Sequence, residues 1–180
     1  GWVIVFIDVS RIHTHCENVR RIVIELPAEA GFSKDHVGVL VKCLYGQRDA
    51  SQLFEMKVLE VLSEVGFTQG RFSPCLYFSQ RRKARTWIHG DDIVTLMPRS
   101  GVASFVEGVG KHLMIKVTAI LGPQQPSRGG KDDAHARIMN RLISWECGFG
   151  GDRDAITWEA DPRHVELLRD QVGLTADSKS

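Results

Sequence analysis

The chain has 180 residues, of which 43% are hydrophobic and 25% are charged, a composition that excludes a wholly disordered or membrane-embedded chain. The length predicts one main folded domain. The formal net charge of +1 gives no overall basic field, so any nucleic-acid-binding surface must be local. The cysteines are widely spaced without a CxxC pair, which argues against a disulfide framework and a zinc knuckle and favours an intracellular setting, cytoplasmic or nuclear.

Apolar and β-branched runs in the first half of the chain predict three strands, at Trp2–Asp8, Arg21–Leu26 and Val37–Leu44. From Asp49 the apolar residues recur at helical spacing, which predicts a helix from Asp49, its N-cap, to Gly66. The opening apolar run is too short to span a bilayer. Because the chain starts inside a predicted strand and without an initiator Met, we expect a fragment of a longer protein.

The second half alternates short strands with helices. Predicted strands lie at Cys75–Ser79, Arg85–His89, Ile93–Met97, Met114–Leu121, Ile138–Trp145 and Ala155–Glu159. Predicted helices cover Gly101–Leu113 and, with Asp161 as N-cap, Pro162 to about Val172. The polar stretch QQPSRGGKDD predicts a flexible linker at 124–134, which separates a main unit at 1–123 from a small unit at 135–180.

Three carboxylates stand out by their context. Asp8 closes a buried apolar strand, and Asp91 and Asp92 lie at the tip of a predicted hairpin. Phosphoryl transfer needs divalent ions that line up the nucleophile and the leaving group, and Mg²⁺ takes one or two protein carboxylates besides substrate oxygens. Adjacent acids in a tight turn also occur simply because Asp favours turns. Spacing alone therefore leaves a metal site and a solvated turn both open.

Five motifs in order resemble those of copia-type retrotransposon reverse transcriptases, which belong to a Pol polyprotein. They are FIDVSRIHTH (6–15), VIELP (23–27), VGVLVKCLYGQRDASQLF (37–54), GF…SPCLYF (66–78) and IHGDDIV (88–94). In the family the corresponding phrases are FLDVKNAF, YxEQP, VCKLKKSLYGLKQAPRAWY, GF…DPCLF and YVDDIL. ILGP (120–123) is similar to the family's FLGIEI strand, and DPRHVELLRDQVGL (161–174) to its closing helix.

The resemblance implies an α+β fold, the reverse-transcriptase palm: an antiparallel sheet backed by two helices, with a small C-terminal thumb-like segment and the fingers missing. It implies RNA-directed DNA polymerisation, in which two Mg²⁺ ions, or Mn²⁺, carry nucleotidyl transfer to a primer 3′-hydroxyl. The implied partners are an RNA template, a DNA primer, a dNTP and the rest of the polyprotein, with its RNase H and integrase; no membrane is implied.

The family's residue roles fall on matching positions of this sequence. Asp8, Asp91 and Asp92 resemble the catalytic, metal-binding aspartates, and Val9 would offer its backbone carbonyl to the nucleotide-side metal. His13 falls at the gate that faces the ribose 2′-hydroxyl. The other substrate-binding positions are Tyr45 and Gly46, beneath the incoming nucleotide, and His89, beside the primer terminus.

Some positions differ from the family pattern. His89-Gly90 replaces Tyr-Val before the paired aspartates, Ile12 stands at a small-residue position, and Asp49 puts a negative charge near the triphosphate position. These differences favour an alternative, a decayed palm that folds, does not polymerise, and at most binds nucleic acid or a partner. A metal phosphohydrolase that uses the same acids is a more distant alternative.

Other groups of residues have simpler explanations. The His13-x-His15-Cys16 spacing offers no fourth metal ligand nearby. The basic run Arg81, Arg82, Lys83 and Arg85 is typical of a solvated turn. Three tryptophans at strand positions could stack on bases, but core packing is the commoner role: Trp87, Trp145 and Trp158.

Overall fold

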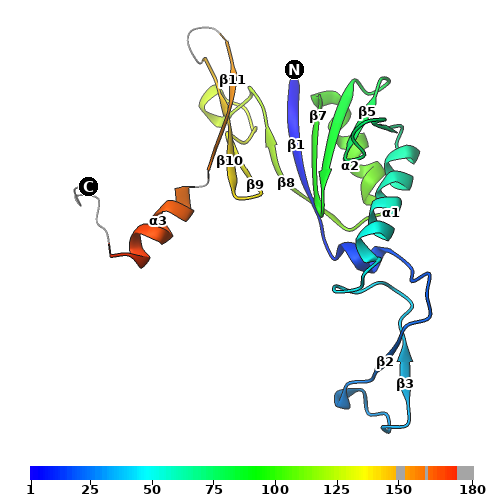
Figure 1. Ribbon diagram of the computed structural model, residues 1–180. Helices are drawn as coiled ribbons and strands as arrows, with labels where there is room; N and C mark the ends of the chain where they lie inside the picture. Colours follow the sequence, from blue (N-terminus) through cyan, green and yellow to red (C-terminus); the bar gives the residue numbers. More distant parts are fainter. Residues whose placement is uncertain (149–152, 161, 174–180) are drawn as a thin grey trace.

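A six-stranded antiparallel sheet forms the centre of the fold (Figure 1), in a computed structural model that describes residues 1–148, 153–160 and 162–173. The strand order is β4-β5-β6-β7-β1-β8. The strands are β1 (Trp2–Val9), β4 (Thr68–Gln69), β5 (Leu76–Ser79), β6 (Ala84–His89), β7 (Asp92–Pro98) and β8 (Ile115–Leu121). The chain is thus α+β with an antiparallel sheet, as the sequence predicts.

Two helices cover one face of this sheet, α1 (Ala50–Glu64) and α2 (Val102–Gly110). The main core lies between the helices and the alternate strand residues that point toward them. From β1 these are Val3, Val5, Ile7 and Val9, each at most 1% exposed. Helix α1 contributes its apolar stripe of Phe54, Val58, Val61 and Leu62, the spacing that predicts the helix. Gly66 ends this helical region in a left-handed conformation, with φ of 89°.

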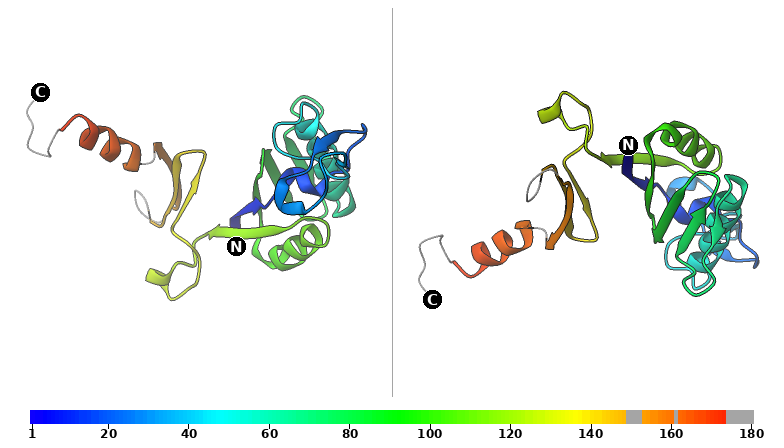
Figure 2. Two further views of the ribbon diagram at one scale, coloured as in Figure 1. Left: turned by 90° about the horizontal axis from the view of Figure 1, so that it is seen from below. Right: turned by 90° about the horizontal axis from the view of Figure 1, so that it is seen from above.

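The opposite face of the sheet is partly covered by a second, three-stranded sheet, in the order β11-β10-β9. Its strands are β9 (His135–Ile138), β10 (Arg141–Glu146) and β11 (Ala155–Ala160). A smaller core joins the two sheets, with Phe6, Ala119 and Leu121 on one side and Ile138 and Ile143 on the other. The last helix, α3 (Pro162–Gln171), extends away from both sheets (Figure 2). None of the helices in the described residues is long and apolar enough to cross a membrane.

An arm of the chain projects from the end of the central sheet (Figure 1). It starts after the short helix η1 (Ile12–His15) and carries the two-stranded ribbon β2 (Val23–Glu25) and β3 (Val37–Val39), with a further single turn, η2 (Ala28–Ala30). Most of its apolar side chains are exposed, including Val23, Val37 and Val39. Residues 40–44, predicted as the end of a strand, form no strand; only Lys42 makes an isolated bridge, with Glu17.

The predicted strand Ile138–Trp145 is wrong, because a tight hairpin turn divides it into β9 and β10. Met139 and Asn140 form the turn with φ of 48° and 57°, the positive pair that a type I′ hairpin requires. Asn tolerates this conformation, but Met seldom adopts it. Because Met139 continues the apolar run, the sequence gives no signal of a turn at this position. Helix α3 starts at Pro162 as predicted; its proposed N-cap, Asp161, lies outside the described residues.

Residues 124–134, which the sequence analysis assigns to a linker, make several hydrogen bonds. The Asp132 side chain is 2% exposed, accepts the Gln124 N–H at 2.8 Å and pairs with Arg99, which directly follows β7. The Gln125 side chain donates to the Trp145 carbonyl at 2.6 Å. A single turn, η4 (Pro126–Arg128), lies between these contacts. The segment thereby connects the central sheet to β10.

Candidate metal and nucleotide site

The tip of the β6–β7 hairpin consists of Gly90 and Asp91, so the predicted hairpin is confirmed, but Asp92, expected at the tip, is the first residue of β7. Gly90 has φ of 59°, whereas Asp91 is not among the positive-φ residues. A positive φ at the first central position only is the type II′ pattern, which favours Gly there. His89 ends β6 and lies directly opposite Asp92, the first residue of β7. The turn and the start of β7 therefore place two adjacent carboxylates at one end of the sheet.

Asp8 reaches the same end of the sheet from the neighbouring strand. It lies directly opposite Asp92 in the β1–β7 pairing, so the two side chains are on one face, the face away from the helices. The next residue, Val9, donates its backbone N–H to the Asp91 carbonyl at 2.8 Å. This hydrogen bond fixes the turn against the end of β1. The pairing brings together Asp8, Val9, Asp91 and Asp92, four of the predicted site residues.

Electrostatics distinguish Asp92 within this group. Burial raises the pKa of the Asp92 carboxyl, and the negative charges of Asp91 and Asp8 raise it further, while His89 acts in the opposite direction. Burial disfavours the charged form, and like charges at short range do the same. A divalent cation would relieve both effects. The carboxylates thus form a locally negative group that a cation would stabilise.

The donor chemistry of this group fits a hard cation such as Mg²⁺. Mg²⁺ prefers oxygen ligands and keeps several waters, so two carboxylates together with substrate phosphate oxygens suffice. Asp8 and one of the paired aspartates would supply them. Within residues 1–148, 153–160 and 162–173, no group of three or more His, Cys, Asp or Glu side chains is arranged so that it could hold a metal ion, and this includes Asp8, Asp91 and Asp92 as a set.

Two further side chains lie in the same row across the sheet. The His89 ring stacks on Trp87, with ring centroids 5.6 Å apart and an interplanar angle of 12°. On the other side, Lys116 of β8 lies directly opposite Asp8. The row His89, Asp92, Asp8, Lys116 thus places two carboxylates between an imidazole and an ammonium. Lys116 is not among the predicted site residues, because only the strand order places it beside Asp8.

The other predicted substrate residues lie together near η1. His13 is 7% exposed, and its ring contacts the edge of Tyr45 at a centroid distance of 4.5 Å. Its Nδ1 is buried and has no hydrogen-bond partner among the residues that the structure describes. Tyr45 is 67% exposed, and Gly46 follows it with φ of 89°. The contact brings His13, Tyr45 and Gly46 into one neighbourhood. Within the described residues, no hydrogen bond, ion pair or ring contact joins them to the three aspartates.

Asp49 holds its predicted position, but its carboxylate has a different partner from the one that a helix N-cap implies. It occupies the N-cap position of α1, but its side chain makes no capping hydrogen bond. Both carboxylate oxygens instead accept bonds from the Arg20 guanidinium at 2.9 Å. Arg20 comes from the arm, 29 residues earlier. The predicted N-cap position is confirmed, but the capping hydrogen bond is absent because this long-range partner binds the carboxylate instead. The Arg20 hydrogen bonds and charge also lower the pKa of Asp49.

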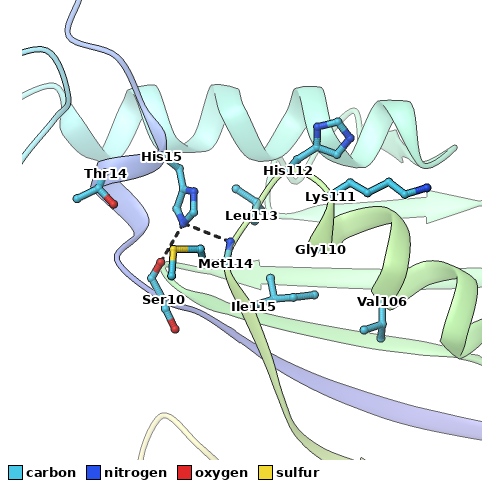
Figure 3. A pocket seen from close by; sticks show the side chains of 10 residues that line it. All are labelled: Ser10, Thr14, His15, Val106, Gly110, Lys111, His112, Leu113, Met114 and Ile115. Carbon is cyan, nitrogen blue, oxygen red and sulfur yellow. Dashed lines mark hydrogen bonds between the residues drawn. The ribbon is translucent and has the colours of Figure 1, made fainter.

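Two hollows border this region on the helix side of the sheet. The first, about 710 Å³, lies between η1 and the α2–β8 loop, where His15 Nε2 is 2.9 Å from the Ser10 carbonyl oxygen and 3.4 Å from the Met114 nitrogen (Figure 3). None of the predicted site residues lines it. The second, about 440 Å³, lies beneath the hairpin tip and includes His89, Gly90 and Ile12 in its lining.

The tryptophans and the basic run are placed as follows. Trp87 and Trp145 pack against the smaller core, as predicted, but Trp158 is 65% exposed, so its predicted core role is wrong. Arg82 is not simply solvated: it donates to the Val65 carbonyl at 2.8 Å and to Ser104 Oγ at 2.9 Å. Burial lowers the pKa of Arg82, and the charge of Arg81 adds to this.

Comparison of the chain with protein-family models, with curated proteins and with solved structures finds no match.

Proposed function

We propose that this chain is the palm of a copia-type reverse transcriptase, which transfers nucleotides from a dNTP to a primer 3′-hydroxyl on an RNA template. The observation that supports it best is the pairing of Asp8 with Asp92 beside the Asp91 turn, on the open face of a helix-backed antiparallel sheet. The five ordered motifs add support, since they fall on β1, the arm, α1, β5 and the β6–β7 hairpin.

In this proposal the acids and their neighbours have separate tasks. Asp8 and Asp91, with Asp92 as their partner, would hold two Mg²⁺ or Mn²⁺ ions, and such ions would supply alignment of the primer hydroxyl and charge neutralisation on the phosphates. The Val9 N–H keeps the turn in place. His13, Tyr45 and Gly46 contact the incoming nucleotide, and His89 contacts the primer terminus. RNase H and integrase, if joined to the chain, act elsewhere in the polyprotein.

Primer extension tests the proposal. The wild-type chain, fused to a fingers segment of a related enzyme, is mixed with an RNA template, a labelled DNA primer, dNTPs and Mg²⁺ or Mn²⁺. We expect extension that Asp91→Asn and Asp8→Asn each reduce at least 100-fold, because neutral amides are poor metal ligands. Asp170→Asn, an exposed change on α3, serves as the matched control and should extend normally. Release of phosphate from nucleotides without a primer would instead indicate the phosphohydrolase alternative.

One observation favours the alternative of a palm that folds without polymerising. Asp49 lies in the segment where the family binds the triphosphate. Its carboxylate accepts two hydrogen bonds at 2.9 Å from the Arg20 guanidinium, so the two charged groups are paired with each other. A triphosphate would meet a carboxylate there. No extension by the wild-type chain, together with extension by Asp49→Gln, the family residue at this position, would identify Asp49 as the cause. No extension by either variant would favour decay.

A further inference from the structure

The open face of the central sheet carries a second group of exposed side chains, at the end opposite the acids. Trp2 starts β1, six residues before Asp8, which corresponds to roughly 20 Å along a strand. Strand pairing puts Phe78, Arg85 and Leu96 in one row beside it. Trp2 and Phe78 are each 46% exposed, so two aromatic rings face solvent on one sheet surface.

A hollow of about 430 Å³ joins these aromatic rings to positive charge. It is lined by Trp2, Phe78, Ser79, Gln80, Lys83 and Arg85 and by no acidic residue. Lys83 and Arg85 make no ion pair with any part of the chain that the structure describes. Arg82, in the same turn, is by contrast engaged with Val65 and Ser104. Beside the aromatic pair, Lys83 of the turn and Arg85 of β6 thus carry positive charges that no ion pair within the described residues neutralises.

We propose that this hollow binds single-stranded nucleic acid, with a base stacked on Trp2 or Phe78 and the adjoining phosphates held by Lys83 and Arg85. Single-strand binders combine aromatic faces with cations along the backbone. A duplex would not suit the hollow, because its bases are already stacked and cannot reach the rings. The site involves neither the acids nor a metal ion, so it does not rest on the proposed polymerase activity.

Fluorescence anisotropy with labelled oligothymidylate and oligouridylate, in EDTA, tests this site. We expect Trp2→Ala and Phe78→Ala each to weaken binding roughly five- to one-hundred-fold, the effect of losing one base–aromatic stack. Lys83→Ala and Arg85→Ala should weaken binding of all sequences and reduce the salt slope by about 0.7 each. Circular dichroism checks folding, and Phe78→Leu replaces Phe78→Ala if the latter unfolds, since it keeps apolar volume but removes the ring.

The chain offers a matched control in the loop before β5. Phe72 is 94% exposed and Arg71 lies 5.7 Å from its ring, outside the hollow. Phe72→Ala and Arg71→Ala should bind like the wild type. Equal losses in these controls, or wild-type binding by the Trp2 and Phe78 variants, would overturn the proposal. Sedimentation that shows a dimer lost in Trp2→Ala, without oligonucleotide binding, would assign the face to a second copy and overturn it as well.

The outcome is independent of primer extension. Binding that is lost in Trp2→Ala but kept in Asp91→Asn supports the site even if the chain never extends a primer. Extension with undiminished binding by the hollow variants keeps the polymerase and removes this site.

Discussion

At the scale of single residues, Asp92 links the fold to the proposed chemistry. Its backbone belongs to β7, whereas its carboxyl is half-buried between Asp8 on one side and His89 on the other. Burial and the charges of Asp91 and Asp8 raise its pKa. A carboxylate in this setting destabilises the fold when ionised without a cation, and it gains most from a bound one.

The pH dependence of stability follows from that direction. Because the pKa of Asp92 is higher in the folded chain than in the unfolded one, its contribution to stability is complete below the unfolded value, near 3.9, and is lost as pH rises through the folded pKa. We therefore expect Asp92→Asn to raise Tm at pH 7, by up to about 2–4 °C, the shift that ~1 kcal/mol gives in a chain of this size.

Thermal unfolding followed by circular dichroism from pH 3 to 8, without divalent ions, measures this effect. The gain in Asp92→Asn should disappear toward pH 3, where both forms are uncharged. Asp35→Asn, in an exposed turn of the arm, is the control and should show no pH-dependent gain. A gain of equal size at pH 3 and pH 7 would refute the electrostatic explanation.

At the scale of elements, the β6–β7 hairpin was predictable because its signals are local. Two short apolar runs flank Gly90-Asp91, and Gly supplies the positive φ that the turn requires. Helix α1 was predictable for a similar reason, since Phe54, Val58, Val61 and Leu62 repeat at helical spacing. The pairing of Asp8 with Asp92 follows only if β1 lies next to β7. The family resemblance implied this, whereas local pattern does not.

Features that depend on distant partners could not be predicted. Asp49 fits an N-cap by sequence, yet Arg20 binds it across the base of the arm. Arg82 lies in a run of charged residues, yet it donates to the carbonyl of Val65, just after α1, and to the hydroxyl of Ser104 in α2. Only the strand order shows that Lys116 lies beside Asp8 and that Trp2 and Phe78 share one surface. Each case requires knowledge of which segments meet in space, which periodicity does not contain.

The β6–β7 pairing contains a buried polar contact whose energetics can be separated. Thr86 and Thr95 are directly opposite each other, at most 1% exposed, with their hydroxyl oxygens 2.8 Å apart. Thr95→Val leaves the Thr86 hydroxyl buried without a partner, so we expect a loss of about 1–3 kcal/mol in the free energy of unfolding. The double change Thr86→Val with Thr95→Val removes both polar groups and should be nearly neutral.

Urea unfolding of the two single variants and the double variant measures the coupling. Thr68→Val, an exposed threonine on β4, serves as the control and should change stability by less than about 0.5 kcal/mol. A double variant that loses the sum of the two single losses would show that the hydroxyls act independently.

At the scale of the whole molecule, three layers restrict where a ligand can bind. Helices α1 and α2 close one face of the central sheet, and the β9–β11 sheet covers part of the other over Phe6 and Leu121. The open remainder of that face has acids at one end and aromatic and basic groups at the other. The position of the C-terminal sheet therefore determines how much of this face is accessible.

The Arg99–Asp132 pair is the contact that we expect to hold that position. Asp132 is 2% exposed, and Arg99 extends to it from the end of β7. Arg99→Ala leaves a buried carboxylate with the Gln124 N–H as a remaining donor, so we expect a loss of about 3–5 kcal/mol. Hydrogen exchange should show lower protection in β9 and β10, whereas β6 and β7 keep theirs if the C-terminal sheet detaches by itself.

Lys57→Ala, which removes a solvent-exposed pair with Glu60, should cost under about 0.5 kcal/mol and leave exchange unchanged. Equal loss of protection in both sheets would show instead that Arg99 and Asp132 stabilise the molecule as one cooperative unit.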